Sequence, residues 1–213
     1  VQTCALPILA KLNIESKFIN GLRVTDAQTM QVVEKSLVEF NSEIIEKLKN
    51  KNCKAEGLNV STNNVFIVEQ ENKELGFVGR PKIILNEKIE NIIKNKTMPI
   101  LSPMGKDADN QKYNINADTA ASAVAKSIKA RRLLLMTDVE GVYDHNKKVI
   151  SEIKPEKAKK LIDTGVVQGG MIPKLLYSID AAENGVKGVV IIDGRKVHSI
   201  LFEIGRAHVW TPV

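Results

Sequence analysis

Apolar residues in the first quarter of the chain recur at helical spacing. Between residues 27 and 49 they fall mostly three, four or seven positions apart, which predicts one long amphipathic helix. Thr25 or Asp26, directly before this segment, can cap its first turn. Residues 86–95 repeat the pattern over a shorter stretch and predict a second helix. Residues 9–12 read as the end of an earlier helix, and residues 14–19 as an extended stretch.

Short apolar runs separated by polar turns indicate strands in the middle of the chain. Residues 55–60, 65–68 and 75–80 have this pattern, and the polar segment 69–74 predicts a turn between the last two strands. This part should therefore be an antiparallel excursion that ends at residues 82–85. Residues 98–105 predict a short buried strand followed by a loop.

The second half alternates strands and helices. Helices are predicted at residues 119–129, 155–164 and 174–184, and strands at residues 132–136 and 188–192. The strands are continuously apolar, which is typical of parallel strands buried on both faces. The order strand, helix, strand predicts an α/β layer with right-handed crossovers. Ligands of such sheets bind at the carboxyl ends of the strands, where residues 137–138 and 193–195 lie.

Composition changes this picture little. The net charge of +6 comes from 31 Lys and Arg against 25 Asp and Glu, but the basic residues are dispersed and mixed with acids. A solvated surface is therefore favoured over a nucleic-acid interface. No apolar run is long enough for a membrane span and no signal peptide is evident, so we expect no membrane association and a cytoplasmic protein. Cys4 and Cys53 lack metal-ligand spacing and are expected to be free thiols.

The two ends of the chain have an unusual sequence. Residues 1–8 and 204–213 resemble conceptual translations of the two orientations of a common sequencing adapter, in which Trp210 stands where the usual frame has a stop codon. The alternative is a genuine tail at each end. Because both ends match, the segments 1–8 and 204–213 are interpreted as artefacts, and the fold is inferred from residues 9–203.

A polar motif precedes the helix predicted at 119–129. In Tyr113-Asn114-Ile115-Asn116-Ala117-Asp118, amide and carboxylate side chains alternate with other residues, and a run of small residues follows. Asn116 and Asp118 are suited to capping the helix and satisfying its first N–H groups. The same side chains could equally be held rigidly as part of a binding site, and the motif alone leaves both interpretations open.

Two further features suggest sites for anions. Gly169-Gly170-Met171-Ile172-Pro173-Lys174 has flexible glycines, then a proline suited to the first position of a helix, then a lysine in its first turn. A lysine is unfavourable at this end of a helix dipole, and an anionic ligand would explain it. Arg23 lies in a predicted loop before the long helix, either as a surface arginine or as a fork that binds a carboxylate with two hydrogen bonds.

With the segments 21–26, 113–118, 137–142, 169–174 and 191–195 in this order, the chain resembles the acetylglutamate kinases of the amino-acid kinase family. The resemblance covers nearly all of residues 9–203. It implies a three-layer α/β/α fold of the carbamate kinase type with a mainly parallel central sheet. The N-terminal lobe, residues 9–112, would bind acetylglutamate, and the C-terminal lobe, residues 113–203, would bind ATP.

The resemblance also implies an activity. Acetylglutamate kinases phosphorylate the γ-carboxylate of N-acetyl-L-glutamate with ATP and Mg²⁺, the second step of arginine synthesis. Carried over by motif, Arg23 holds the α-carboxylate of the substrate and Asn114 binds its backbone-like end. Lys174 stabilises the phosphoryl group as it leaves ATP, and Asp118 orients the catalytic lysines. No residue is assigned as a metal ligand. The nucleotide is bound by two segments: Asp138, Val139, Glu140, Gly141, Val142, Tyr143, and Val166, Val167, Gln168.

Regulation and assembly follow from the same resemblance. His198 and Glu203 match a region that binds arginine in feedback-inhibited members of the family. Family members are also dimers or hexamers, so the full-length protein is expected to be a homo-oligomer.

The chain departs from the family pattern at both ends. It lacks the first strand with a Lys and paired glycines, the following His-Gly-Gly-Gly loop, and the glycine-rich finish of the sheet. The first strands of the sheet, roughly two βα units by the family pattern, would therefore be missing. We expect the chain as printed to be an inactive and poorly stable fragment. The alternatives are a non-catalytic amino-acid-binding module or another member of the amino-acid kinase family.

Overall fold

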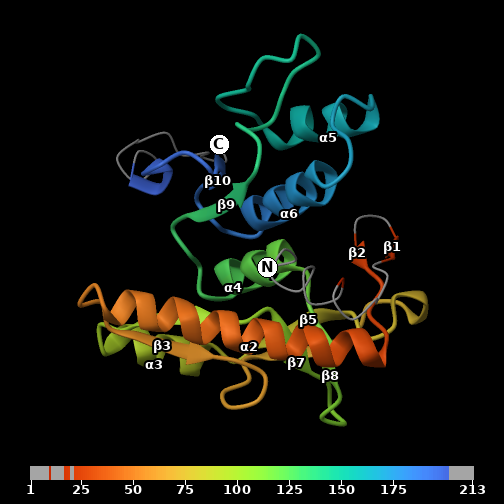
Figure 1. Cartoon of the computed structure of the whole chain (residues 1–213). Coiled ribbons are helices and arrows are strands. Elements are labelled where there is room, and N and C mark those ends of the chain that lie inside the picture. Colours follow the sequence, from red (N-terminus) through yellow and green to blue (C-terminus); the bar gives the residue numbers. More distant parts are fainter. Residues whose placement is uncertain (1–9, 11–16, 20–21, 202–213) are drawn as a thin grey trace. The chain divides into compact units, whose positions relative to one another are not determined.

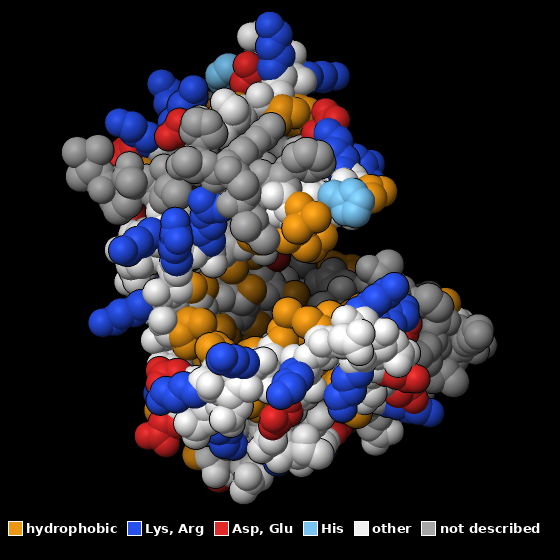
Figure 2. All heavy atoms as spheres, turned by 90° about the vertical axis from the view of Figure 1, so that its left-hand side faces the viewer, with side chains coloured by type: hydrophobic (Ala, Val, Ile, Leu, Met, Phe, Trp, Pro, Cys, Tyr) orange, Lys and Arg blue, Asp and Glu red, His pale blue; other side chains and the backbone are white. Residues whose placement is uncertain are grey.

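The computed structural model describes residue 10 and residues 17–19 and 22–201. The adapter-like segments 1–8 and 204–213 lie outside these residues, as do Glu203 and most of the predicted segments 9–12 and 14–19. The chain forms two compact units that divide after Ala120. Among the described residues, no helix combines the length and apolarity needed to cross a bilayer. Lys and Arg side chains are spread over the face drawn in Figure 2, with Asp and Glu among them.

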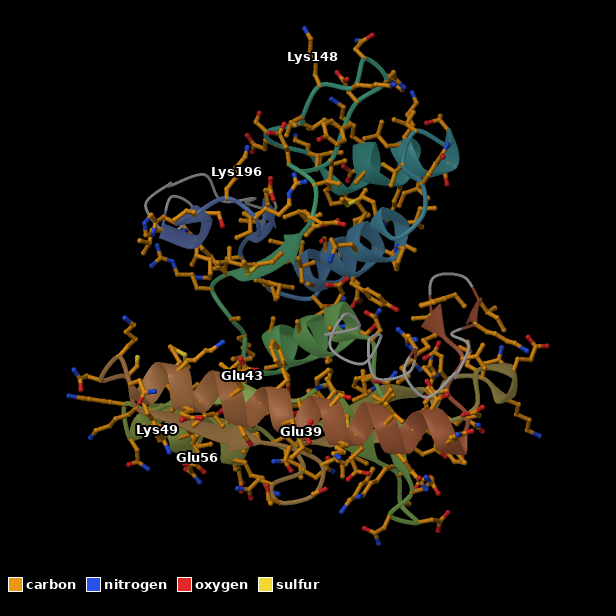
Figure 3. All side chains as sticks on the ribbon, viewed as in Figure 1. Glu39, Glu43, Lys49, Glu56, Lys148 and Lys196 are labelled. Atoms are coloured by element: carbon orange, nitrogen blue, oxygen red, sulfur yellow. The ribbon has the colours of Figure 1, made fainter. Side chains whose placement is uncertain are left out.

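The first unit is organised along helix α2, Ala27–Lys49, at the bounds predicted from the sequence (Figure 1). Asp26, and not Thr25, is the cap, because its side chain accepts a 2.7 Å hydrogen bond from Thr29 N. Glu43 lies on α2 (Figure 3), and on the exposed face of this helix it accepts a hydrogen bond from Lys47 at 2.6 Å. The buried face of the helix contributes Met30, Val33 and Leu37 to a core, in which they pack with Val60 and Met104.

The strands among the described residues of the first unit form three sheets. In the first sheet β1 (Phe18–Ile19) pairs with β2 (Leu22–Arg23), and in the second β3 (Ala55–Leu58) pairs with β6 (Met98–Leu101). The third sheet has four strands in the order β5 (Gly79–Ile84), β4 (Phe66–Gln70), β7 (Met104–Lys106) and β8 (Lys112–Asn114). The β3–β6 and β4–β7 pairs are parallel, whereas β1–β2, β4–β5 and β7–β8 are antiparallel. Helix α2 packs against β3, β6 and β8, and α3 (Asn86–Lys94) packs against β6. The predicted antiparallel excursion is therefore confirmed in β4 and β5.

The third predicted strand of this excursion, residues 75–80, is placed wrongly. Residues Lys73–Leu75 instead form the short 3₁₀ helix η1, because the Asn72 side chain accepts a hydrogen bond from Glu74 N at 3.0 Å. Gly76 follows with φ of +67°, which interrupts extended backbone. Strand β5 starts only at Gly79 and runs through the residues expected to end the excursion.

The loop predicted after the strand at 98–105 is also wrong in part. Residues 104–114 contain two more strands, β7 and β8, which pair antiparallel as a hairpin. Asp107 closes the turn, since its Oδ1 accepts 2.9 Å hydrogen bonds from Asp109 N and Gln111 N. The polar composition of this turn concealed the short strands on either side of it.

Helix α4, Ala117–Ser127, begins before the division between the units and continues beyond it. The second unit then has β9 (Leu133–Thr137), α5 (Pro155–Asp163), α6 (Met171–Glu183) and β10 (Val189–Asp193). Strands β9 and β10 pair in parallel, as predicted, and their register runs from Leu133↔Val189 to Thr137↔Asp193. Helix α6 packs against β10 and α5 packs against α6 (Figure 1).

Helix α6 starts three residues earlier than predicted. Met171 N and Ile172 N donate to Gln168 O and Gly169 O, so the first turn is already closed before Pro173. Pro173 is therefore the third residue of the helix and not the first. It still lies within the first turn, where a missing N–H leaves no helical hydrogen bond unmade.

Candidate active-site residues

Arg23 lies in strand β2 and is buried, with 4% of its surface exposed. The prediction of a loop position is wrong, and so is the alternative of a surface arginine. The guanidinium stacks on the Phe18 ring at 4.9 Å from the ring centroid, while the backbone oxygen accepts from Thr25 Oγ1 at 3.2 Å. Burial lowers the pKa of Arg23 from its usual value. A partly desolvated cation in a fixed position is suited to binding a carboxylate.

Asn114 lies at the end of β8, where the segment Gly76–Val78 connects it to the surroundings of Arg23. Asn114 N donates to Phe77 O at 2.9 Å, and Phe77 N donates to Thr25 O at 2.7 Å. Thr25 is fully buried and pairs with Gly76, whereas Asn114 pairs with Val78. One segment therefore holds the loop after β2 on one side and the end of β8 on the other, which brings both predicted substrate-binding regions of the first unit together.

The motif at 113–118 combines a core, a cap and candidate site residues. Tyr113 and Ile115 are buried, and the Tyr113 ring packs on Phe77 with centroids 6.1 Å apart. Asn116 Oδ1 accepts hydrogen bonds from Asp118 N at 3.0 Å and from Thr119 N at 3.1 Å. The capping interpretation is therefore confirmed for Asn116. Asp118 lies in the first turn of α4, where the helix dipole stabilises a carboxylate.

The two predicted nucleotide-binding segments of the second unit meet in one apolar cluster. Val142, after β9, and Val167, between α5 and α6, are both buried there together with Leu175. Val142 O accepts from Ile150 N at 2.7 Å, and Val167 N donates to Leu161 O at 3.1 Å. The structure thus brings residues 138–143 and 166–168 together through Val142 and Val167.

The loop after β9 continues into a tight turn. Asp144 Oδ1 accepts from Asn146 N at 2.8 Å and from Lys148 N at 2.9 Å, and these backbone hydrogen bonds lower the pKa of Asp144. Tyr143 pairs with Val149 across the turn. Lys148 lies in the outer part of this loop (Figure 3). The turn fixes the end of the predicted nucleotide-binding segment.

Lys174 lies on the fourth position of α6, next to Leu175 of the core. Its side chain is half-buried, and its backbone oxygen accepts from Ser178 Oγ at 2.8 Å. A Cβ built on either of the preceding glycines, Gly169 and Gly170, meets no atom within 4 Å. The backbone before Lys174 therefore borders open space, as a loop that approaches a ligand requires.

A polar cluster at the carboxyl ends of β9 and β10 joins the predicted nucleotide-binding residue Glu140 to Asp193, Arg195 and Lys196, for which the sequence predicted no role. Asp193 is buried, and Arg195 donates to it from Nε at 2.9 Å and from Nη2 at 3.0 Å. Lys196 forms an ion pair with Glu140 at 2.9 Å. Asp193 and Arg195 belong to the motif at residues 191–195, and their place at the carboxyl end of a parallel strand is the sequence signal that indicates a function.

Of the two predicted effector residues, the structure describes His198. His198 adopts a φ of +62° directly before a helical turn, and its backbone oxygen accepts from Leu201 N at 2.9 Å. Glu203 lies outside the described residues. The pairing of the two residues in one effector site stays a prediction.

Comparisons with known proteins agree with these observations. The sequence profile of the amino acid kinase family matches residues 3–193. The acetylglutamate kinase of Pelagibacter ubique is 55% identical over 196 residues, which cover 92% of this chain and 68% of that protein. The structure of smu.665 from Streptococcus mutans superposes with a TM-score of 0.85 at 32% identity, covering 90% of this chain and 78% of the other.

More distant structures share the fold alone. Carbamate kinase from Giardia lamblia bound to AMP-PNP has a TM-score of 0.65 at 16% identity, covering 96% of this chain and 76% of the other. The amino-acid kinase fold expected from the sequence is therefore confirmed. The chain belongs to the amino acid kinase family, within its acetylglutamate kinase branch.

Proposed function

We propose that the protein phosphorylates the γ-carboxylate of N-acetyl-L-glutamate with ATP, in the biosynthesis of arginine. The observation that carries this proposal is the 55% identity with an acetylglutamate kinase over 92% of the chain. The buried Arg23 supports it, because the acceptor is a small dicarboxylate whose α-carboxylate needs a fixed cation.

For the acceptor, we assign Arg23 to the α-carboxylate and Asn114 to the backbone-like acetamido end. The shared segment Gly76–Val78 would fix the spacing between these two regions, since it is hydrogen-bonded to both Thr25 and Asn114. An acceptor held at both its α-carboxylate and its acetamido end would present its γ-carboxylate in one orientation. Such positioning lowers the entropic part of the barrier to phosphoryl transfer.

For the donor, ATP as its Mg²⁺ complex is the proposed substrate of the second unit. The segments 138–143 and 166–168 would bind the nucleotide, since Val142 and Val167 belong to one apolar cluster. Lys174 would stabilise negative charge on the transferred phosphoryl group, and the Asp118 carboxylate would orient the catalytic lysines. Phosphoryl transfer needs no covalent intermediate on the protein, so positioning and positive charge carry the catalysis.

Regulation, assembly and location are further parts of the proposal. The match of His198 and Glu203 to an effector region suggests feedback inhibition by arginine. The resemblance to dimeric and hexameric kinases suggests a homo-oligomer for the full-length protein. The cytoplasm, where ATP-dependent biosynthesis takes place, is the proposed location.

Binding measurements test this function without requiring turnover. Isothermal titration calorimetry should show that the 213-residue chain binds N-acetyl-L-glutamate and ATP, with much weaker binding of free L-glutamate, L-aspartate and carbamate. Preference for one of the other acceptors would assign the chain to another branch of the family, and binding of an amino acid without ATP would indicate a binding module. The 213 residues contain no His-Gly-Gly-Gly motif, so we further propose that they bind both substrates without measurable phosphoryl transfer.

A further inference from the structure

An ion pair joins the turn after β10 to the predicted nucleotide-binding loop after β9. Lys196 Nζ lies 2.9 Å from Glu140 Oε1, although the two residues are far apart in sequence. Lys196 projects from the turn that follows β10 (Figure 3). The hydrogen bond to Glu140 raises the pKa of Lys196, so the lysine is charged at neutral pH. Both side chains are about half exposed.

The turn that carries Lys196 is fixed independently of this ion pair. Asp193 accepts from Arg195 N at 3.0 Å, in addition to the two hydrogen bonds from the Arg195 guanidinium. Gly194 N donates to Thr137 O at 2.8 Å, which ties the turn to the end of β9. Lys196 N in turn donates to Asp193 O at 3.3 Å. The backbone of Lys196 is therefore held at the joint end of both strands.

Glu140 lies between two anchored points of its own loop. Thr137 belongs to β9 and pairs with Asp193, and Val142 is buried in the apolar cluster. Gly141, next to Glu140, has a φ of +154°, a backbone conformation that residues with a side chain rarely adopt. The ion pair thus attaches the middle of the loop to a rigid turn.

We propose that Lys196 is a positioning residue that holds residues 138–141 in the nucleotide-binding conformation through Glu140. The proposal rests on the nucleotide-binding role proposed for this loop. A half-exposed ion pair contributes about a two- to fivefold change in an equilibrium, so the expected effect is modest and confined to the loop. Lys196 acts through Glu140 and is not assigned a contact with the substrate.

Hydrogen exchange of the 213-residue chain tests the positioning role without a ligand. Peptides covering residues 138–144 should exchange about two- to fivefold faster than in the wild type in both Lys196→Met and Glu140→Gln. The double variant should exchange no faster than either single variant. Lys196→Arg should restore the slow exchange. Lys159→Met is the matched control, because Lys159 forms a similarly exposed ion pair with Glu183 at 2.8 Å between α5 and α6. Unchanged exchange in both single variants, additive effects, or an equal effect of Lys159→Met would each overturn the proposal.

Titration with ATP then separates this proposal from the function on which it rests. Lys196→Met should weaken ATP binding about two- to fivefold and leave the affinity for N-acetyl-L-glutamate unchanged, while Lys196→Arg restores ATP binding. Faster loop exchange with unchanged ATP affinity would overturn the link to the nucleotide. If the unsubstituted chain does not bind ATP, the nucleotide function fails, and with it the assignment of Lys196 to nucleotide positioning, whatever the exchange measurement shows.

Discussion

The carboxylate of Asp193 and the guanidinium of Arg195 form a two-point ion pair within one turn of the chain. Oδ1 accepts from Nε at 2.9 Å and Oδ2 accepts from Nη2 at 3.0 Å. Asp193 is buried at the end of β10, whereas the Arg195 side chain is 62% exposed. A buried carboxylate therefore holds an exposed cation in a fixed orientation beside the predicted nucleotide loop.

This pair predicts a stability change in acid. The hydrogen bonds from Arg195 lower the pKa of Asp193 from its ordinary value of 3.8 to about 2. A lowered folded-state pKa means that the stabilisation is fully present above 3.8 and is lost as the pH falls through about 2. The free energy of unfolding should fall over this range in the wild type and less steeply in Asp193→Asn. Denaturant titrations between pH 2 and 5 measure both slopes, and equal slopes would contradict the prediction.

The cap of α4 predicts a second change. Asn116→Ala removes the acceptor of the Asp118 and Thr119 amides and should destabilise the protein by about 1 kcal/mol. Asn116→Asp keeps an acceptor oxygen at the same position and should stay near the wild type. Urea unfolding followed by circular dichroism compares the two variants. A loss as large in Asn116→Asp would show that the amide has a role other than capping.

Two glycines in strands of the first unit, Gly105 and Gly57, should respond differently to an added methyl group. A Cβ at Gly105 would lie 2.7 Å from the backbone oxygen of Phe66 and 2.5 Å from Val68 Cγ1. At Gly57 the nearest atoms, Asn41 Oδ1 at 2.5 Å and Ile45 Cδ1 at 2.8 Å, are ends of side chains that can move. Gly105→Ala should therefore destabilise the first unit by about 2–3 kcal/mol, and Gly57→Ala by about 1 kcal/mol.

Urea unfolding of both alanine variants measures this difference. Asn41 Nδ2 also donates to Ile100 O at 2.8 Å, so any displacement of Asn41 in Gly57→Ala weakens one interior hydrogen bond. The order of the two variants is the test, and a greater loss in Gly57→Ala would show that the side chains around it are not free to adjust.

Arg23→Lys should weaken N-acetyl-L-glutamate binding by about ten- to a hundredfold, because a lysine cannot form the two-point hydrogen bond to a carboxylate. Calorimetry measures the affinity, and ATP binding should stay unchanged. Arg80→Lys is the control, since Arg80 is exposed and forms its ion pairs with Glu69 and Glu71. Equal losses in both variants would remove Arg23 from the proposed acceptor site.

The substitution Lys174→Met should weaken the binding of ATP more than the binding of ADP. If Lys174 contacts the phosphoryl group that is transferred, ATP binding should weaken about tenfold or more while ADP binding changes little. Paired titrations with ATP and ADP measure the ratio directly. Equal weakening for both nucleotides would place the lysine elsewhere in the nucleotide site.

The sequence predicted those features that depend on local periodicity. The bounds of α2 were correct because a long amphipathic helix with an Asp cap leaves little choice. The strand at 75–80 was misplaced because the decision between strand and turn rests on the contact of Gly76 with Thr25, which lies on a distant segment. A surface position for Arg23 was one of two interpretations because its segment was predicted to be a loop, whereas Arg23 lies in the hairpin β1–β2 and its guanidinium stacks on the Phe18 ring. The pairing of Lys196 with Glu140 depends on strand register, which periodicity does not contain.

The parallel pairing of β9 with β10 also has a consequence for how the second unit folds. Helices α5 and α6 both lie between the two strands in sequence, so the pair can form only after a long loop has closed. Contacts between distant residues form slowly compared with local helices. The joint end of the two strands, with Asp193 and Lys196, should therefore be among the last parts of this unit to acquire protection during refolding.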